Sequence, residues 1–349
     1  MPAADVEIRG AGPVGCTLAL ALADSPHRVR VVDPQAGGAL PAFRPIALSH
    51  ASRLILERVG AWGAFPVTPI GTIHVSQAGA FGRTRMEASE AGVPALGYVT
   101  QYADLVAALR ARLSIEREPG AAPRLAVHAE GSAADSRERR YAQDAIVARV
   151  AAEPASQATA YERFTAEGPL ALLPLAGEWA LIWSARPERA AALAAAPEDA
   201  FLAELQRAAG GRAGRFVAVR SRASLPLVQR VRATRVEARA VYIGNAAQTL
   251  HPVAGQGLNL GLRDALDLAQ ALRAAEDPGA PQALARFAAA RRFDAAAAAG
   301  VTELLARGFT GANPLARAAR GAALALLDAA PPARNFFARR MIFGPSALP

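Results

Sequence analysis

The pattern Gly10-Ala-Gly-Pro-Val-Gly15 lies between a short apolar segment, Val6–Arg9, and an apolar stretch from Cys16. Between a strand and a helix, the first glycine permits a tight turn and the second lets backbone approach a pyrophosphate, while the third lets the helix pack on the strand. The helix N-terminus would add free N–H groups and a positive dipole end. Asp33 ends the next predicted strand, Val29–Val32, where a carboxylate can bind ribose hydroxyls. The sequence therefore predicts a Rossmann-like dinucleotide site, with an unliganded glycine-rich turn as the alternative; its candidate residues are Gly10, Gly12, Gly15 and Asp33.

Composition excludes several other chemistries. All 39 residues counted as Lys or Arg are arginines, so the chain has neither a Schiff-base lysine nor a Walker A loop. Cys16 is the single cysteine, which excludes a disulfide framework and a multi-cysteine zinc site and favours a reducing cytosol. The formal charge of +9 is a weak indication of nucleic acid when every cation is Arg. We expect no metal and no nucleic-acid partner.

The order of predicted elements indicates the fold class. Strands and helices alternate at the N-terminus, β-like runs fill the middle, and the last part is helical. We therefore expect an α/β (mixed α+β) chain with a Rossmann-like domain, an inserted β-sheet domain and C-terminal helices. The expected divisions are a discontinuous dinucleotide-binding domain over 1–160 and 228–280, a substrate-domain sheet over 161–227, and helices over 281–349. The predicted helices are Cys16–Ala23, His50–Val59, Ala103–Leu113, Glu198–Ala209 and Leu258–Ala275.

A second glycine-rich constellation runs from Val241 to Asp264. A short apolar strand ends at Gly244-Asn245, a polar loop containing His251-Pro252 follows, and Gly255 and Gly257 lead into the helix expected from Leu258. Glycines remove the Cβ atoms that would hold a flat ring system away from the backbone. The helix start would direct its dipole at negative charge on that ring. The block therefore predicts a site for a flat cofactor ring, against the alternative of an ordinary strand–loop–helix unit.

These motifs resemble the class A flavoprotein aromatic hydroxylases, and within them the ubiquinone-biosynthesis hydroxylases. The likeness is strongest to the 2-octaprenyl-6-methoxyphenol hydroxylase branch, because Gly244-Asn245 stands where the wider family has Gly-Asp. An asparagine amide can still hydrogen-bond a flavin ribityl hydroxyl. The resemblance runs nearly end to end; its other segments are Arg44–Ser49, Leu56–Trp62, Tyr161–Thr165, Gly168–Pro174, Arg291–Asp294, Thr302 and Arg320-Gly321.

The resemblance implies an FAD monooxygenase that uses NAD(P)H as a transient reductant and O2 to hydroxylate the ring of a polyprenyl phenol. Arg44 is placed beside the flavin, and Gln101 either contacts the flavin chain or merely begins a helix. His251 with Pro252 is the catalytic candidate, although a structural histidine is the alternative. The implied cofactor-binding residues are Gly10, Gly12, Gly15, Asp33, Arg44, Gln101, Gly244, Asn245, Gly255, Gly257, Leu258 and Asn259.

The chain departs from the family before Glu130. The family has a third signature, Asp-Gly with a downstream arginine, for which Glu130-Gly131 and Arg137 are the candidates here. Only 16 residues separate Leu113 from Glu130, where the family places a β-hairpin and a further strand. A catalytically inactive paralogue that acts as an assembly or lipid-presenting subunit is therefore the alternative. A simple NAD-dependent dehydrogenase would leave the Val241–Asp264 block unexplained.

The C-terminal segment Leu315–Phe343 mixes five arginines with apolar residues at partly helical spacing. One interpretation is a solvated helix face; the other is a basic amphipathic helix lying on an anionic membrane, where a polyprenyl substrate would be reached. No uninterrupted apolar stretch is long enough to span a bilayer. We therefore expect a cytoplasmic protein, with peripheral contact to the inner membrane and a ubiquinone-biosynthesis complex as further possibilities for its partners.

Overall fold

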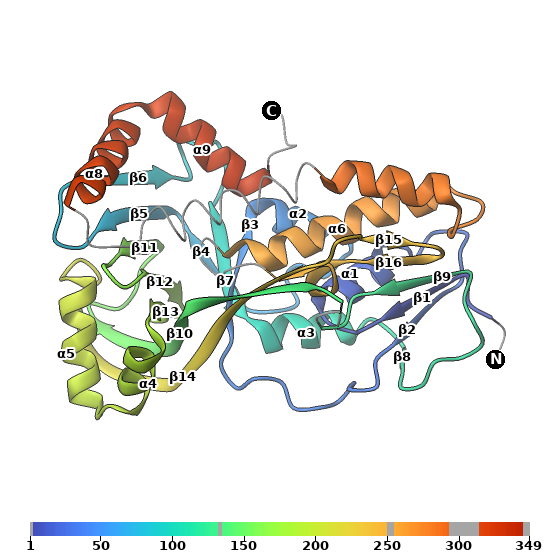
Figure 1. Ribbon diagram of the computed structural model, residues 1–349, viewed down its shortest axis with the longest axis horizontal. Coiled ribbons are helices and arrows are strands. Elements are labelled where there is room, and N and C mark those ends of the chain that lie inside the picture. The colour runs from blue at the N-terminus through green and yellow to red at the C-terminus, as the bar shows by residue number, and fades with distance from the viewer. Residues whose placement is uncertain (1–2, 132–134, 250–254, 293–313, 345–349) are drawn as a thin grey trace.

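The computed structural model describes residues 3–131, 135–249, 255–292 and 314–344. Three sheets and the helices packed on them form two lobes, which lie side by side in Figure 1 with the N-terminus in the right-hand lobe.

The first lobe is built on a six-stranded sheet in the order β15-β16-β9-β1-β2-β8. Its centre is β1 (Val6–Arg9), which pairs in parallel with β2 (Val29–Val32) and β9 (Leu125–His128). The outer strands are β8 (Ile115–Glu116), β16 (Ala240–Tyr242) and β15 (Val236–Glu237). Buried apolar side chains of this sheet and of the helices form one core; those helices are α1 (Pro13–Ala21), α2 (His50–Arg58), α3 (Tyr102–Arg110) and α6 (Gln256–Arg273).

The second lobe is built on an eight-stranded sheet in the order β17-β14-β10-β13-β12-β11-β5-β6. Two strands of 17 residues each, β10 (Arg137–Glu153) and β14 (Arg215–Val231), pair antiparallel along its length. The remaining strands are β5 (Thr72–Gln77), β6 (Arg83–Glu87), β11 (Thr159–Phe164), β12 (Pro169–Leu175), β13 (Glu178–Ala185) and β17 (Gln248–Thr249).

Helices cover both faces of this second sheet. On one face, α4 (Pro187–Ala195) packs on β10 and α5 (Glu198–Ala209) packs on β14. At the other, α8 (Pro314–Ala329) packs on β5 and β6, and α9 (Pro331–Phe343) reaches from β6 to β3 (Figure 1). A small antiparallel sheet of β3 (Pro45–Ser49), β7 (Gly97–Gln101) and β4 (Thr68–Ile70) joins the lobes. Apolar residues of α9 therefore face the junction between the lobes.

The mixed α/β class, the parallel N-terminal sheet and the C-terminal helices are confirmed. Helix α5 has the predicted bounds, whereas α1, α3 and α6 begin one to three residues earlier than the apolar pattern indicated. The sheet of the second lobe is larger than residues 161–227, because β5, β6 and β10 from the range 1–160 pair within it. The large sheet therefore includes strands from residues that the sequence had assigned to the dinucleotide-binding domain.

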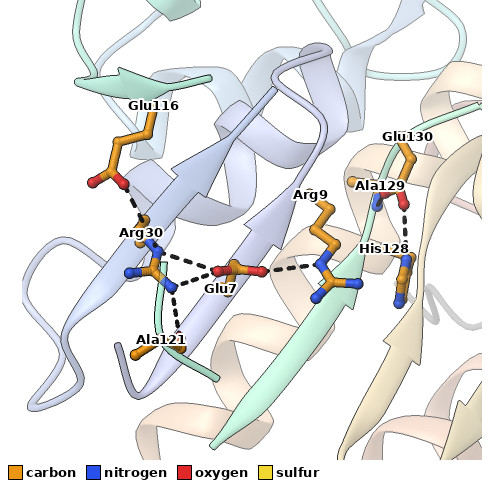
Figure 2. A network of polar contacts seen from close by, with 8 residues as sticks. All are labelled: Glu7, Arg9, Arg30, Glu116, Ala121, His128, Ala129 and Glu130. Carbon is orange, nitrogen blue, oxygen red and sulfur yellow. Dashed lines mark hydrogen bonds and ion pairs between the residues drawn. The ribbon is translucent and has the colours of Figure 1, made fainter. Parts of the chain in front are cut away.

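The short connection before Glu130 holds β8, a loop over 117–124 and β9, with no hairpin among these residues. Arg30, on β2, fastens this loop by donating to the Ala121 carbonyl at 2.9 Å. The same guanidinium donates to Glu7, which is 1% exposed and also accepts from Arg9 (Figure 2). A buried carboxylate shared between two arginines therefore takes part in closing this end of the sheet.

Candidate functional site

A cavity of about 1130 Å³ lies between the two lobes and is lined by residues from both. This exceeds the roughly 300–1,000 Å³ of a pocket for one drug-sized ligand, so it has room for a large cofactor and a substrate. Ten of the predicted cofactor-binding residues line it: Gly10, Gly12, Asp33, Arg44, Gly244, Asn245, Gly255, Gly257, Leu258 and Asn259. Gly15 and Gln101 do not, and His251 and Pro252 lie outside the described residues.

The three glycines of the first motif have different structural roles. Gly10 has φ +101°, and a Cβ there would stand 2.7 Å from the Glu130 nitrogen. A Cβ at Gly15 would stand 2.0 Å from the Gly10 carbonyl oxygen, so Gly15 serves the packing of α1 on the turn. At Gly12 the nearest atom to such a Cβ is the Tyr102 hydroxyl, 3.5 Å away. The space above Gly12 is therefore part of the cavity, at the N-terminus of α1.

Asp33 lies at the end of β2 beside this turn, as predicted. Its Oδ2 accepts from the Ala11 N–H at 3.0 Å and from the Arg110 guanidinium at 3.1 Å. Arg110 also donates through Nε to the Ala11 carbonyl at 2.8 Å. Arg110 lines the cavity but was not predicted from the sequence, because it lies in the last turn of α3, far from any glycine motif. Together Asp33 and Arg110 hold the glycine turn in place and present opposite charges to a ligand.

Arg44 and Tyr102 form a second part of the wall. The Arg44 guanidinium lies over the Tyr102 ring, 4.4 Å from its centroid, and both residues line the cavity. Gln101 precedes α3 and keeps its side chain out of the lining, but its buried Oε1 accepts no hydrogen bond from the described residues. The planar, stacked cation of Arg44 suits an anionic or aromatic ligand.

The Gly244-Asn245 turn reaches the cavity between β16 and α6. Gly244 has φ +59° and packs against Val14, whose Cγ2 would lie 3.0 Å from an added Cβ. Its N–H donates to Asp264 at 3.1 Å, and Asp264 is fully buried between Arg235 and Arg291. Asn245 is exposed and lines the cavity, with its side chain available to a ligand.

The start of α6 is prepared by two glycines. Gly255 caps the helix in the left-handed region at φ +58°, and a Cβ at Gly257 would meet no atom within 4 Å. Asn259 is 3% exposed, and its amide bonds Ser49, Ser52, Ala47 and Gly255. Its side chain therefore ties α6 to β3 and α2, which leaves Gly257 and the helix N-terminus to face a ligand.

Glu130 and Gly131 also line the cavity, next to Gly10. Glu130 accepts from the Ala129 N–H at 3.0 Å, and its other oxygen lies 2.8 Å from His128 Nδ1 (Figure 2). Arg137 begins β10 and is exposed. Of the third candidate signature, Glu130-Gly131 thus lies at the glycine-turn end of the cavity, whereas Arg137 is not part of the lining.

The half of the cavity inside the second lobe is apolar. Its walls come from the sheet and from α8 and α9; they include Ile73, Val75, Met86, Leu173, Ile182, Leu324, Leu327, Phe337, Met341 and Ile342. Thr84 and Ser184 add hydroxyls, and Glu162 adds a carboxyl. The site therefore combines a glycine-rich polar half with an apolar chamber. No group of metal-ligating side chains occurs in the described ranges.

Comparison with known proteins agrees with this geometry. The sequence pattern of a family described as "FAD binding domain" matches residues 107–302. The ubiquinone hydroxylase UbiL of Rhodospirillum rubrum is 33% identical over 383 residues, covering 96% of this chain and 89% of that protein. The 3-demethoxyubiquinol 3-hydroxylase of Escherichia coli is 28% identical, covering 74% and 77%. The p-nitrophenol 4-monooxygenase PnpA of Pseudomonas putida shares the fold, with a TM-score of 0.78, 17% identity and 99% of each chain covered.

The fold and site therefore define a flavoprotein of the monooxygenase class. The chain belongs to the FAD-binding-domain family, in the group of class A aromatic hydroxylases of ubiquinone biosynthesis. FAD is its cofactor, and the open positions above Gly12 and Gly257 fit a pyrophosphate and a flat ring. The alignment with UbiL is longer than this chain of 349 residues, so UbiL carries residues that this chain lacks. Within the described residues, no helix has the length and apolarity to cross a membrane.

Proposed function

We propose that the protein hydroxylates the aromatic ring of a polyprenyl phenol, with NAD(P)H and O2 as co-substrates. The observation that carries this proposal is the continuity of the cavity, whose glycine-rich half opens into an apolar chamber next to the candidate flavin position. A phenol with a long hydrocarbon chain matches such walls, because burial of apolar surface drives its binding. The relatives with names from ubiquinone biosynthesis support the same substrate class.

The residues of this chain have distinct roles in holding FAD. The N-terminus of α1 and Gly12 take the pyrophosphate, Asp33 takes the ribose of the adenosine, and Asn245 bonds the ribityl chain. Gly257 and the N-terminus of α6 lie against the flat ring, with Arg44 in the adjoining wall. The bound flavin supplies electron transfer from NAD(P)H and the activation of O2. The apolar chamber orients the phenol and excludes water.

The alternative is an inactive paralogue that assembles with other proteins or presents the lipid. Its motivation is the shortened connection of residues 117–124, where the family has a hairpin. The structure supports the active enzyme in one respect, since β9 is present and pairs with β1 on one side and with β16 on the other. The strand that carries Glu130 is therefore retained without the hairpin.

A single purification distinguishes these two functions. An active enzyme is purified with flavin absorbance at about 450 nm and oxidises NAD(P)H in the presence of a prenyl phenol. Mass spectrometry then detects a product that is heavier than the substrate by one oxygen atom. Colourless protein that takes up no added FAD, or flavoprotein that forms no hydroxylated product from any prenyl phenol tested, would instead favour the paralogue.

We also propose that α8 and α9 bring the chamber to a lipid surface. Three of the five arginines of this segment are held by other parts of the chain, so they do not form the solvated basic face that one interpretation of the sequence predicted. Arg334 is buried and paired with Glu90 at 2.7 Å, and Arg317 and Arg320 bond to Gly79 and Gln77. The exposed residues of α8 are instead uncharged and include Leu326, which is 70% exposed. On α9, Phe336 is 62% exposed and Arg339 is exposed as well.

The inner faces of the same two helices line the apolar chamber. A bilayer against their outer face would place the hydrocarbon that dissolves the substrate one helix away from the chamber. Peripheral contact with the inner membrane, and assembly with other ubiquinone-biosynthesis proteins, are thus proposed on a surface that carries exposed apolar side chains together with Arg339.

A further inference from the structure

Glu162 is a carboxyl group in an apolar wall. It lies on β11 and, by strand alternation, faces the cavity together with Ala160 and Phe164. Its partners in register on the neighbouring strands are Val75 and Ala171, which line the same chamber. Among the described residues, nothing donates a hydrogen bond or forms an ion pair with its carboxylate. A carboxyl in such surroundings lacks a structural partner and is open to a ligand.

The charged groups of the elements around Glu162 are engaged elsewhere. His74 of β5 contacts Tyr161 on the opposite face of the sheet, and β12 has no charged residue. Glu178 of β13 pairs with Arg149 and Arg220. The strand β6 turns Thr84 and Met86 to the cavity and its charged residues away from it. The charged residues of α8 and α9 are absent from the lining; they are Arg317, Arg320, Asp328, Arg334, Arg339 and Arg340.

We propose that Glu162 is the general base that takes the proton of the substrate's phenol hydroxyl, an inference that rests on the proposed hydroxylase function. The phenol O–H bond breaks, its electron pair stays on the ring oxygen, and the proton forms a new O–H bond with a Glu162 carboxylate oxygen. Ring hydroxylation then consumes O2 and NAD(P)H, which the proposed function already supplies. The charge left on the oxygen makes the ring more electron-rich and more reactive towards an electrophilic oxygen.

The surroundings of Glu162 match this role chemically. Burial raises the pKa of the Glu162 carboxyl to about 7. A phenol ionises near a pKa of about 10, as tyrosine does, whereas an ordinary glutamate has a pKa of about 4.3. The mismatch between base and phenol thus falls from about six pH units to about three. A base with a pKa near the working pH is the one that transfers protons most effectively.

Glu162→Gln keeps the size of the side chain and removes the base. General-base catalysis contributes roughly 10²- to 10⁴-fold to a rate, so we expect the rate of product formation to fall at least 100-fold in an assay at about pH 7.5. The FAD content and the NAD(P)H-driven reduction of the flavin should be retained. The matched control is Glu118→Gln, the same change in an exposed loop outside the cavity, which should leave the rate unchanged.

A second substrate tests the proton itself. A fluorinated prenyl phenol that is already ionised at the assay pH needs no base, so Glu162→Gln and wild type should hydroxylate it at similar rates. For wild type, kcat/KM should rise with pH through about 7 with the ordinary phenol and lose that rise with the fluorinated one. If Glu162 had only a structural role, Glu162→Gln would lower the hydroxylation rates of both substrates equally.

Three results are decisive. If the wild-type protein forms no hydroxylated product, the proposed function itself is contradicted, whatever the role of Glu162. Active wild type with an unchanged rate in Glu162→Gln overturns the assignment of Glu162 alone. If Glu162→Gln does not retain FAD, the pH profiles of wild-type kcat/KM decide the question. A rise of kcat/KM near about pH 7 that persists with the ionised phenol also overturns the assignment of Glu162.

Discussion

At the scale of single residues, Gly12 and Gly15 of one motif should respond differently to substitution. Gly12→Val places its side chain in open cavity space above the turn, where the pyrophosphate is proposed to lie. We expect FAD affinity to be abolished while the apoprotein unfolds at an unchanged temperature. Gly15→Ala should instead destabilise the apoprotein, since its Cβ would meet the Gly10 carbonyl oxygen at 2.0 Å.

Titration with FAD, followed by flavin fluorescence, measures the first effect, and thermal unfolding of the apoprotein measures the second. Gly211→Val is a matched control, because a Cβ at Gly211 meets no atom within 4 Å and Gly211 lies outside the cavity. Unchanged FAD affinity in Gly12→Val would refute the placement of the pyrophosphate.

Asn245 tests the other end of the cofactor. It is exposed and lines the cavity, so a bound ribityl chain can use its amide without any rearrangement of the turn. Asn245→Asp should retain FAD, because a carboxylate also accepts a hydrogen bond from a hydroxyl, whereas Asn245→Leu should lose affinity by roughly 1–3 kcal/mol. Equal FAD dissociation constants for the two variants would show that position 245 does not contact the cofactor.

At the scale of elements, the Glu7–Arg30 pair holds β1, β2 and the short loop of residues 117–124 together (Figure 2). Arg30→Met leaves the buried Glu7 carboxylate with Arg9 alone and frees the Ala121 carbonyl. Removing one partner of a buried ion pair typically costs about 3–5 kcal/mol, so a loss of about 3 kcal/mol in unfolding free energy is expected.

Chemical denaturation measures that loss. Arg28→Met is the control on the same segment, since Arg28 is exposed and its pair with Asp5 spans 3.6 Å. Such surface pairs contribute about 0–1 kcal/mol. Equal stabilities for the two variants would mean that the network does not fasten the loop.

The outer face of α8 and α9 makes a separate prediction about lipid. Leu326→Gln with Phe336→Gln should weaken flotation with phospholipid vesicles at least tenfold, because each large apolar side chain moved into hydrocarbon contributes roughly 1.5–3 kcal/mol. Leu54→Gln, an exposed leucine on α2, should not change binding. Vesicle binding that is equal in the double variant and in wild type would exclude these helices as the docking face.

At the scale of the whole molecule, the sequence predicted the parts that depend on local pattern. The glycine turn, Asp33 and the Gly244–Leu258 block lie together around one cavity because each motif is tied to a strand end or a helix start. Arg110 and Glu162 could not be predicted in the same way. Arg110 comes from the end of a helix with an ordinary apolar pattern, and Glu162 lies in a strand whose sequence is not otherwise unusual.

Sheet membership was also beyond local pattern. Strands β5 and β10 join the large sheet through partners, β11 and β14, that lie up to about a hundred residues away in the chain, and no turn or spacing indicates such pairing. Strand β6 follows β5 into the sheet as a local hairpin. Arg334 shows the same limit for charge, because its partner Glu90 is distant in sequence. An arginine in an amphipathic segment therefore cannot be assigned to solvent before its tertiary neighbours are known.

The half-buried Glu162 should also affect the stability of the whole molecule. Desolvation raises the pKa of the Glu162 carboxyl to about 7 in the folded protein, against an ordinary glutamate pKa of 4.5, so the folded state binds the proton more tightly than the unfolded state does. Below pH 4.5, the pKa of the carboxyl in the unfolded chain, Glu162 is protonated in both states and does not lower the free energy of unfolding. As the pH rises towards 7, the unfolded state ionises more readily and the folded state loses stability. At about 1.36 kcal/mol per pKa unit, the loss reaches about 3 kcal/mol above neutrality.

The side chain in Glu162→Gln is uncharged at every pH, so the variant should not lose unfolding free energy in this way. The variant should therefore match wild type near pH 4.5 and be more stable by up to about 3 kcal/mol at pH 8, at equal FAD concentration. Denaturation midpoints measured across this range give the difference, with Glu118→Gln as the control that should follow wild type throughout. A gap between Glu162→Gln and wild type that does not widen with pH would show that the carboxyl is solvated. A gap that does widen, with product formation lost in the same variant, would mean that the folded state gives up stability to keep a base inside an apolar chamber.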